Sequence, residues 1–206
     1  MNTDSGFVIV ISGPSGVGKG AIADAAMKRF PRLQRSVSAT TRAPRAGEVE
    51  GKHYFFRSGD EFRRMAEGGE LVEWTTYLDD SYGTPRAEVD RILAAGNWAL
   101  FEIDVVGGRS IRAAYSDAVL VFVAPPSWDA LAKRLAGRQS ETEGGLARRL
   151  EVARREIECA GEYDYVIIND RLDDAVDLLC AIVRAEQARP SRVDLNRLRE
   201  QARAKP

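Results

Sequence analysis

The sequence contains few of the residues that build metal centres and disulfide frameworks. It has one histidine and two cysteines among 206 residues, which excludes histidine-rich metal sites and a fold held together by several disulfides. Lysine and arginine number 30 against 31 aspartate and glutamate, so no strong net charge draws the chain to nucleic acid or to an anionic membrane. We therefore expect a reducing, cytoplasmic location and no nucleic-acid partner.

Long apolar runs are missing as well. The longest one, over residues 118–126, is about half of what a bilayer-spanning helix needs. No apolar segment follows the polar start Met1–Asp4, so we expect neither a membrane span nor a secretory signal. What the chain does have, 44% apolar and 30% charged residues, is typical of a globular protein. Its length of 206 residues suits one compact α/β domain with room for an inserted lobe.

Four β-favouring runs alternate with helical patterns along most of the chain. The runs cover residues 7–11, 99–105, 118–124 and 165–168, and the helical patterns cover 21–30, 107–115, 127–137, 142–159 and 172–188. This alternation predicts an α/β fold with a central parallel sheet that is flanked by helices on both faces.

The segment from 35 to 82 breaks this alternation. Its short alternating runs and many turn residues predict a small β-rich lobe at 35–82, inserted into a core of residues 1–34 and 83–190. Residues 139–145 have loop composition and lie between two arginine-bearing helical patterns. They predict a helical lid over about residues 134–149.

The end of the chain, residues 191–206, is a basic tail. From 189 onward there are six lysines and arginines against two acids. We expect a solvated or frayed extension here. The alternative is a short amphipathic helix through Val193, Leu195 and Leu198.

A glycine-rich motif follows the first apolar run. Residues 13–19 read Gly-Pro-Ser-Gly-Val-Gly-Lys and open a helical pattern, which predicts a phosphate-binding loop whose backbone N–H groups face phosphate oxygens. A dinucleotide-binding pattern overlaps at 16–21, but it needs an acid about 20 positions on, and none occurs from 25 to 47. The residues we expect to bind ATP are Gly13, Pro14, Ser15, Gly16, Val17, Gly18, Lys19 and Gly20.

The position after Lys19 departs from the usual motif. Serine or threonine normally stands there and its hydroxyl helps to hold Mg²⁺, whereas this chain has Gly20 followed by Ala21. A direct metal ligand is therefore missing. We expect phosphates, water and acidic residues to hold the ion.

Two further pairs of charged residues are candidates for binding a ligand. Arg42 and Arg45, three apart on an irregular segment, can fork onto one phosphate, although a solvated basic loop would have the same composition. Glu102 and Asp104 close an apolar run, at the strand end where open α/β sheets place ligands. Charges there are costly unless they are satisfied, which favours a functional role.

From Thr40 to Phe56 the sequence matches the pattern Thr-[Ser/Thr]-Arg-x-x-[Lys/Arg]-x-x-[Asp/Glu]-x-x-Gly-x-x-Tyr-x-[Phe/Tyr]. In this the chain resembles the guanylate kinase family of P-loop nucleoside monophosphate kinases. The resemblance spans about residues 8–188. It departs at Arg57, where the family usually has an aliphatic residue or lysine, and at Val106, where many relatives have glutamine. It continues through residues 73–74, 82–84, 102–104, 124–127, 134, 138, 148–150 and 168–170.

The resemblance implies roles for individual residues. Ser38 and Glu73 would read the base, because a carboxylate accepts hydrogen bonds from the guanine ring N–H and amino group together. The GMP site would also include Arg42, Arg45, Glu48, Tyr54, Tyr82, Thr84, Glu102 and Asp104. The catalytic set would be Lys19, Arg42, Asp104, Arg134, Arg138 and Arg149, with Asn169 near the adenine of ATP.

The activity that the resemblance implies is GMP + ATP → GDP + ADP, with dGMP as a further acceptor and Mg²⁺ as cofactor. Asp104 would approach the ion through water, and the partners would be small molecules only. Two other functions stay open. Gly20 and Ala21 favour a catalytically silent binding module of the same fold. A related kinase that acts on a sugar phosphate is disfavoured by the presence of both Ser38 and Glu73.

Overall fold

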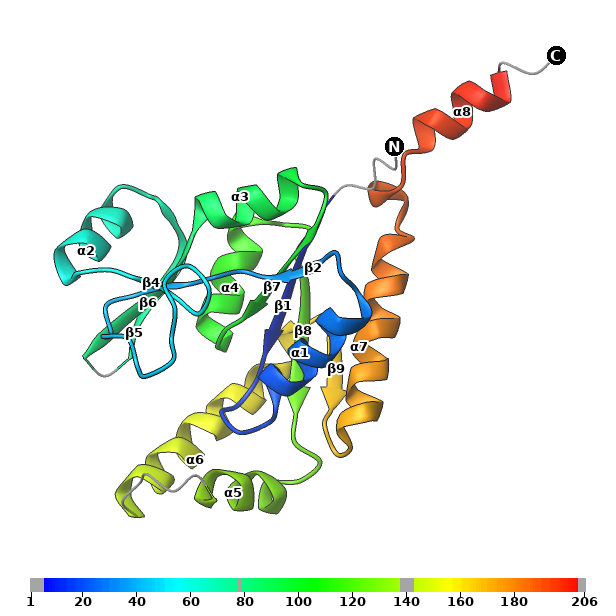
Figure 1. The fold of residues 1–206 in the computed structure, drawn as a ribbon. Coiled ribbons are helices and arrows are strands. Elements are labelled where there is room, and N and C mark those ends of the chain that lie inside the picture. The colour runs from blue at the N-terminus through cyan, green and yellow to red at the C-terminus, as the bar shows by residue number, and fades with distance from the viewer. Residues whose placement is uncertain (1–5, 78, 138–142, 204–206) are drawn as a thin grey trace.

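The computed structural model describes residues 6–77, 79–137 and 143–203. Its centre is a five-stranded sheet of order β2-β7-β1-β8-β9 in which every neighbouring pair is parallel (Figure 1). The predicted central parallel sheet is confirmed. Its strands are β1 (Val8–Ser12), β2 (Leu33–Arg35), β7 (Trp98–Glu102), β8 (Val119–Ala124) and β9 (Tyr165–Ile168).

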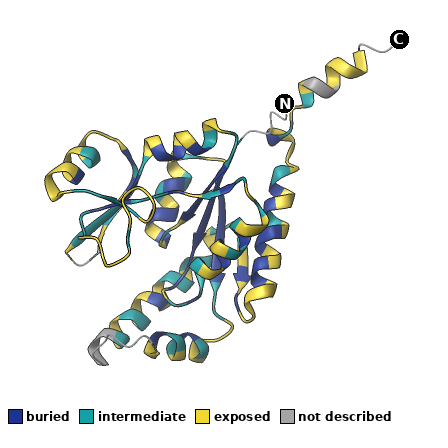
Figure 2. Cartoon of the chain, in the orientation of Figure 1, coloured by how far each residue is buried: buried dark blue, intermediate teal, exposed yellow. Residues whose placement is uncertain are grey.

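Helices cover both faces of this sheet, because side chains of β1 alternate between two cores. Ile9 and Ile11 pack in one apolar cluster, and Val8 and Val10 pack in the other. The buried strands run between half-exposed helices in Figure 2. The first cluster is covered by α1 (Lys19–Arg29), α5 (Trp128–Ala136), α6 (Glu143–Glu158) and α7 (Leu172–Gln187), and the second by α3 (Arg86–Ala94) and α4 (Val105–Ala114).

A second sheet of order β4-β3-β6-β5 forms a smaller unit beside the first. It carries a helix, α2 (Gly59–Glu67), that the turn-rich sequence did not predict. The signal for α2 is a capping box, in which Ser58 and Glu61 satisfy each other's backbone N–H groups. The strands are β3 (Ala39–Thr40), β4 (Phe55–Phe56), β5 (Leu71–Tyr77) and β6 (Asp80–Pro85).

The strand predicted at 99–105 ends earlier than expected. β7 stops at Glu102, and Asp104 is the N-cap of α4, where its Oδ1 accepts a hydrogen bond from the Gly107 N–H at 2.8 Å. A carboxylate at this position satisfies one of the unpaired donors of the first helical turn. The polar residue therefore begins a helix and does not extend the strand.

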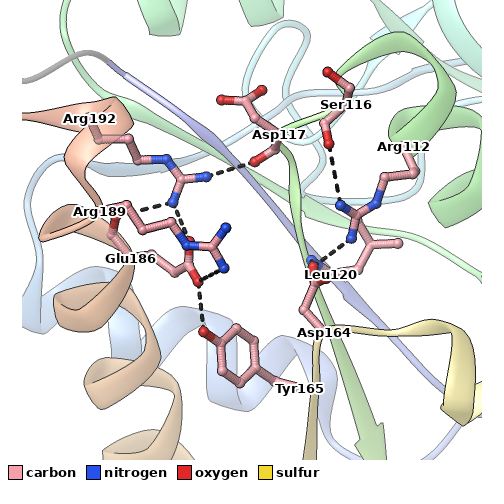
Figure 3. Close-up of polar contacts among 9 residues, drawn as sticks. All are labelled: Arg112, Ser116, Asp117, Leu120, Asp164, Tyr165, Glu186, Arg189 and Arg192. Atoms are coloured by element: carbon pink, nitrogen blue, oxygen red, sulfur yellow. Dashed lines mark hydrogen bonds and ion pairs between the residues drawn. The ribbon is translucent and has the colours of Figure 1, made fainter.

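The prediction of a solvated or frayed tail is wrong in two places. Arg192, in the short 3₁₀ helix η2 (Pro190–Arg192), is only 4% exposed and donates to Glu186 and to the Asp117 carbonyl (Figure 3). The chain then forms α8 (Leu195–Arg203), which is the helical alternative. A further 3₁₀ helix, η1 (Cys159–Glu162), follows α6. Within the described residues, none of the helices is long and apolar enough to cross a membrane.

Candidate active site

The glycine-rich loop joins β1 to the start of α1. Gly13 and Gly18 adopt φ angles of 137° and 96°, in the region that disfavours other residues. A Cβ atom would lie 2.2 Å from the Val123 carbonyl at Gly13, and 2.5 Å from Asn169 Nδ2 at Gly18. Both glycines are therefore required by conformation and by space.

Lys19 is the first residue of α1, so its ammonium group lies at the positive end of that helix. The Nζ donates to the carbonyl oxygens of Gly13 and Pro14. The first turn of α1 contains no acidic residue. The loop thus combines a helix N-terminus, tightly folded backbone and a lysine, which together suit a polyanion such as a triphosphate.

Asn169 lies directly beneath this loop. Its buried side chain donates through Nδ2 to the Val17 carbonyl at 2.7 Å, and its backbone carbonyl accepts from Arg134 Nη2 at 3.1 Å. Asn169 therefore fastens the loop to the end of β9 and ties Arg134 to it. Of the other predicted lid arginines, Arg149 is on α6, and Arg138 lies outside the described residues.

A cavity of about 180 Å³ lies between the second sheet and the end of β7. A larger hollow of about 630 Å³, between α2 and the β5–β6 hairpin, contains none of the predicted site residues. The smaller cavity brings together six of them, with Thr75 and Ile103 in addition. Its predicted lining residues are Ser38, Tyr54, Glu73, Tyr82, Glu102 and Asp104.

Glu73 is a buried carboxylate at the wall of this cavity, 7% exposed. Thr84 does not line the cavity and instead donates from Oγ1 to Glu73 Oε1 at 2.7 Å. Burial raises the pKa of Glu73, the Thr84 hydrogen bond opposes that rise, and the Asp104 charge adds to it. Thr84 fixes one side of the carboxylate, which leaves acceptor capacity for a ligand.

Arg42 stands beside the two tyrosines of the cavity. Its Nη2 donates to both oxygens of Glu48 at 2.8 and 3.0 Å, and its guanidinium lies 5.4 Å from the centre of the Tyr54 ring. These hydrogen bonds hold the pKa of Glu48 below its usual value. Arg45 is exposed, and its backbone N–H donates to Glu48 Oε2 at 2.7 Å. Both arginines therefore act on Glu48, Arg42 through its guanidinium and Arg45 through its backbone N–H and its charge.

The cavity and the phosphate loop adjoin at Glu102. The strand pairing places Glu102 beside Ile11, at the end of β1 from which the loop starts. Glu102 Oε2 accepts from Arg35 Nη2 at 3.2 Å. A Cβ atom at Gly20 would lie 3.2 Å from Glu102 Oε1. One carboxylate thus separates the cavity from the loop.

The sequence did not predict that an acidic residue of α6, Glu156, lies near Lys19. Glu156 of α6 lies within electrostatic reach of Lys19 and Asp104, and burial raises its pKa to about 7, against the attraction of Lys19 and with the repulsion of Asp104. The signal was its spacing from Arg149: residues seven apart share one helix face. Arg35, which pairs with Glu102 and Asp24, was also missed.

These features define a class of protein. A phosphate loop at the carboxyl edge of a parallel sheet, with a separate cavity opening beside it, is the architecture of a P-loop enzyme that acts on two substrates. The family model described as guanylate kinase matches residues 5–186. The chain belongs to the guanylate kinase family.

Individual relatives agree with this assignment over nearly the whole chain. A guanylate kinase of Desulfitobacterium hafniense (strain Y51) is 43% identical over 192 residues, which are 93% of this chain and 96% of that protein. One of Symbiobacterium thermophilum is 47% identical, over 93% of this chain and 90% of that protein. The crystal structure of guanylate kinase from Anaplasma phagocytophilum superposes with a TM-score of 0.78 at 32% identity, over 100% of this chain and 99% of that one.

Proposed function

We propose that this protein transfers the γ-phosphoryl group of ATP to GMP, giving ADP and GDP, and that it also accepts dGMP. The observation that carries the proposal is the junction at Glu102. There, a cavity lined by a buried carboxylate and two tyrosines opens beside a phosphate loop. Membership of the guanylate kinase family supports the same two substrates.

The phosphates of ATP bind in the glycine-rich loop. Backbone N–H groups of the loop, which Pro14 lacks, face the phosphate oxygens, and Lys19 exchanges its carbonyl partners for them. Arg134, Arg138 and Arg149 close on the phosphates from the lid. Because negative charge spreads over the transferred group's oxygens, these cations stabilise the transition state more than the ground state.

GMP binds in the cavity with its base at Glu73. One carboxylate accepts from the ring N–H and the amino group of guanine, with Ser38 as a second contact, whereas adenine offers no such donor pair. Tyr54, Tyr82 and Arg42 hold the GMP phosphate, and Glu48 orients Arg42. Arg45 joins them by turning inward from its exposed position.

The reaction needs in-line placement and little covalent help from the protein. An oxygen of the GMP phosphate forms a bond to the γ-phosphorus, and the bond from that phosphorus to the β–γ bridging oxygen breaks, so ADP leaves with the electron pair. The attacking phosphate is already ionised, so no general base is required. Closure of the lid and lobe excludes water as a competing acceptor.

Mg²⁺ fits the donors at the junction. Glu102 and Asp104 offer carboxylate oxygens, the ligand type that Mg²⁺ prefers. The described part of the chain has no cluster of three or more metal-binding side chains. This suits an ion that binds chiefly to substrate phosphates and water. When bound, Mg²⁺ neutralises charge on the ATP phosphates. The proposal includes a cytoplasmic location, which cell fractionation tests.

The test is ADP release from ATP and Mg²⁺ with GMP, AMP, UMP or ribose 1,5-bisphosphate offered in parallel. We expect strong release with GMP alone, and with dGMP in a second series. Selective release with the sugar phosphate would replace this proposal by a different kinase activity. GMP binding without release in any arm would identify a silent binding module.

A further inference from the structure

The larger hollow, between α2 and the β5–β6 hairpin, is not used by the proposed reaction. Its volume of about 630 Å³ lies within the range of small-molecule sites. Successive side chains of a strand point to opposite faces of a sheet. Accordingly, Glu73 and Thr75 of β5 line the smaller cavity proposed for GMP, and Trp74 between them lines the hollow. A ligand in the hollow therefore does not compete with GMP for space.

Trp74 gives the hollow an open aromatic surface. The residue is 54% exposed, although the buried Phe62 packs against it in a T-shaped pair with 6.5 Å between ring centres. Across the strands Trp74 pairs with Gly83, where a Cβ atom would lie 2.8 Å from the Trp74 Cβ. Glycine at 83 thus leaves the sheet face beside Trp74 open. The indole is supported by the fold but is not covered by it.

The charge around Trp74 is mainly negative. Three carboxylates line the hollow, from Glu67 of α2 and from Asp79 and Asp80 of the hairpin. Across the part of the chain that the structure describes, these carboxylates make no hydrogen bond or ion pair. The positive group at the hollow is Arg63, which is already paired with Asp60 of the same helix at 3.3 Å. The hollow therefore has uncompensated negative charge beside an exposed indole.

This combination is complementary to an organic cation. A positive charge is attracted to the electron-rich face of an indole, and the carboxylates add Coulombic attraction. A nucleotide, which is an anion, is repelled by the same charges. We infer that the larger hollow is a second binding site, for a small aromatic cation that packs on Trp74 with its charge toward the acids. The site can be occupied at the same time as the GMP cavity, because the sheet separates them.

Benzamidine, a flat aromatic cation, is the probe, and benzamide, its uncharged analogue, is the control ligand. Calorimetry gives the affinities. The indole N–H signals of the three tryptophans, in nitrogen-15-labelled protein, give the location. We expect benzamidine to shift the Trp74 signal and to bind about tenfold more tightly than benzamide, with a smaller ratio at high salt. Equal affinities, or an unmoved Trp74 signal, would overturn the inference.

Two acids of the hollow are then neutralised together. Glu67→Gln with Asp80→Asn keeps the side-chain sizes and should weaken benzamidine binding about fivefold or more, while benzamide binding stays the same. Glu70→Gln with Asp90→Asn is the matched control, because it removes two exposed carboxylates that do not line the hollow. An equal loss in both double variants would mean that the overall charge of the protein attracts the probe, against the inference.

Trp74→Leu tests the aromatic surface. Since Trp74 is more than half exposed, the fold should persist, which thermal unfolding checks, and benzamidine affinity should fall about fivefold. Trp128→Leu, at the exposed tryptophan of α5, should leave it unchanged.

Glu73→Gln tests whether the probe binds in the smaller cavity, which is also lined by carboxylates. Benzamidine affinity should not change, and a loss would place the probe there and overturn the inference. None of these measurements uses ATP or GMP, so failure of the proposed function leaves the inference standing.

Discussion

The two edges of the central sheet use similar residues in opposite ways. At the amino edge, the buried Glu186 accepts from Tyr165 at 2.7 Å, and it also pairs with Arg189 and Arg192 (Figure 3). At the carboxyl edge, the cavity beside the end of β7 is lined by Glu73 of the second sheet, which has one hydrogen-bonded side, held by Thr84. Both are buried glutamates, yet one is surrounded by partners and the other keeps an oxygen for a ligand.

The comparison shows that burial of a charged group does not by itself identify a binding site. Arg192 donates to Glu186 and to the Asp117 carbonyl and lies 4.2 Å from the Phe7 ring centre, so its contacts join the end of α7 to the start of β1. Most polar atoms of this network are paired within the fold, which contributes stability, although Arg192 Nε is buried without a hydrogen-bond partner among the described residues. The acids at the carboxyl edge face a cavity and a loop, and their free acceptor positions are available for hydrogen bonds from a substrate.

The largest expected effect is at the carboxyl edge, from Lys19→Ala. Removing the loop's ammonium group should lower the rate of ADP release on the order of 10³-fold, because it stabilises charge that develops on the phosphates. Thermal unfolding should change little. Lys28→Ala, on the exposed last turn of the same helix, is the control. Turnover near the natural rate would remove Lys19 from the site.

Next comes the amino edge, where Arg192→Ala should lower the free energy of unfolding by about 3 kcal/mol. This is the lower end of the range for breaking a buried ion pair, since Glu186 keeps Tyr165 and Arg189 as partners. Urea denaturation measures it. Activity per folded molecule should not change. A control chain that ends after residue 194 keeps Arg192 and should be nearly as stable as the full chain. If this truncation lowers the free energy of unfolding as much as Arg192→Ala does, the stabilisation comes from α8 and not from Arg192.

Glu73→Gln tests what the unused oxygen does. The single carbonyl oxygen of an amide cannot accept from both guanine donors. The ratio of kcat/KM for GMP to kcat/KM for AMP should therefore fall roughly thirtyfold, which corresponds to a loss of about 2 kcal/mol of transition-state stabilisation. Glu88→Gln is a matched control, because Glu88 is also 7% exposed but bonds to Arg91 on α3. Unchanged preference for GMP over AMP would show that another residue reads the base.

The smallest expected effect is a pH dependence from Glu156. Its pKa rises from 4.5 to about 7 on folding, so the native state binds more protons than the unfolded state between these values. Stability should therefore fall as pH rises from 4.5 to 7. Glu156→Gln should remove this fall, with a gain on the order of 1 kcal/mol at pH 8 after allowance for solvent screening and almost none at pH 5.

Urea midpoints at the two pH values measure the Glu156 effect. Glu158→Gln, an exposed acid two residues along the same helix, should show no such difference. A Glu156→Gln variant that is equally stabilised at both pH values would mean that the charge is not what destabilises the fold.

Local patterns predicted the elements whose signals are continuous in sequence. β9 was predicted with its observed bounds, and α7 ends one residue before its predicted end at 188. Apolar periodicity suffices there because each element packs on one continuous core. By contrast, β3 and β4 have two residues each, and they exist only through pairing with strands distant in sequence.

The site shows the same division. The loop and its lysine were readable because the motif is contiguous, and the family pattern pointed to the cavity residues. Arg192 was read as part of a solvated tail because its partner Asp117 is 75 positions away. Thr84 behind Glu73, and Asn169 beneath the loop, are likewise products of tertiary contact. Sequence identifies residue types that can act, whereas only folding decides which of them face a ligand.

The contacts of Lys19 with the carbonyls of Gly13 and Pro14 have a consequence for the heat of nucleotide binding. The Lys19 ammonium group already donates to carbonyl oxygens of the loop. A bound triphosphate therefore replaces these hydrogen bonds with new ones and does not simply add to them. Calorimetry should record a smaller net enthalpy than the number of new phosphate contacts suggests. The affinity of the loop is a competition between a nucleotide and the loop's own backbone.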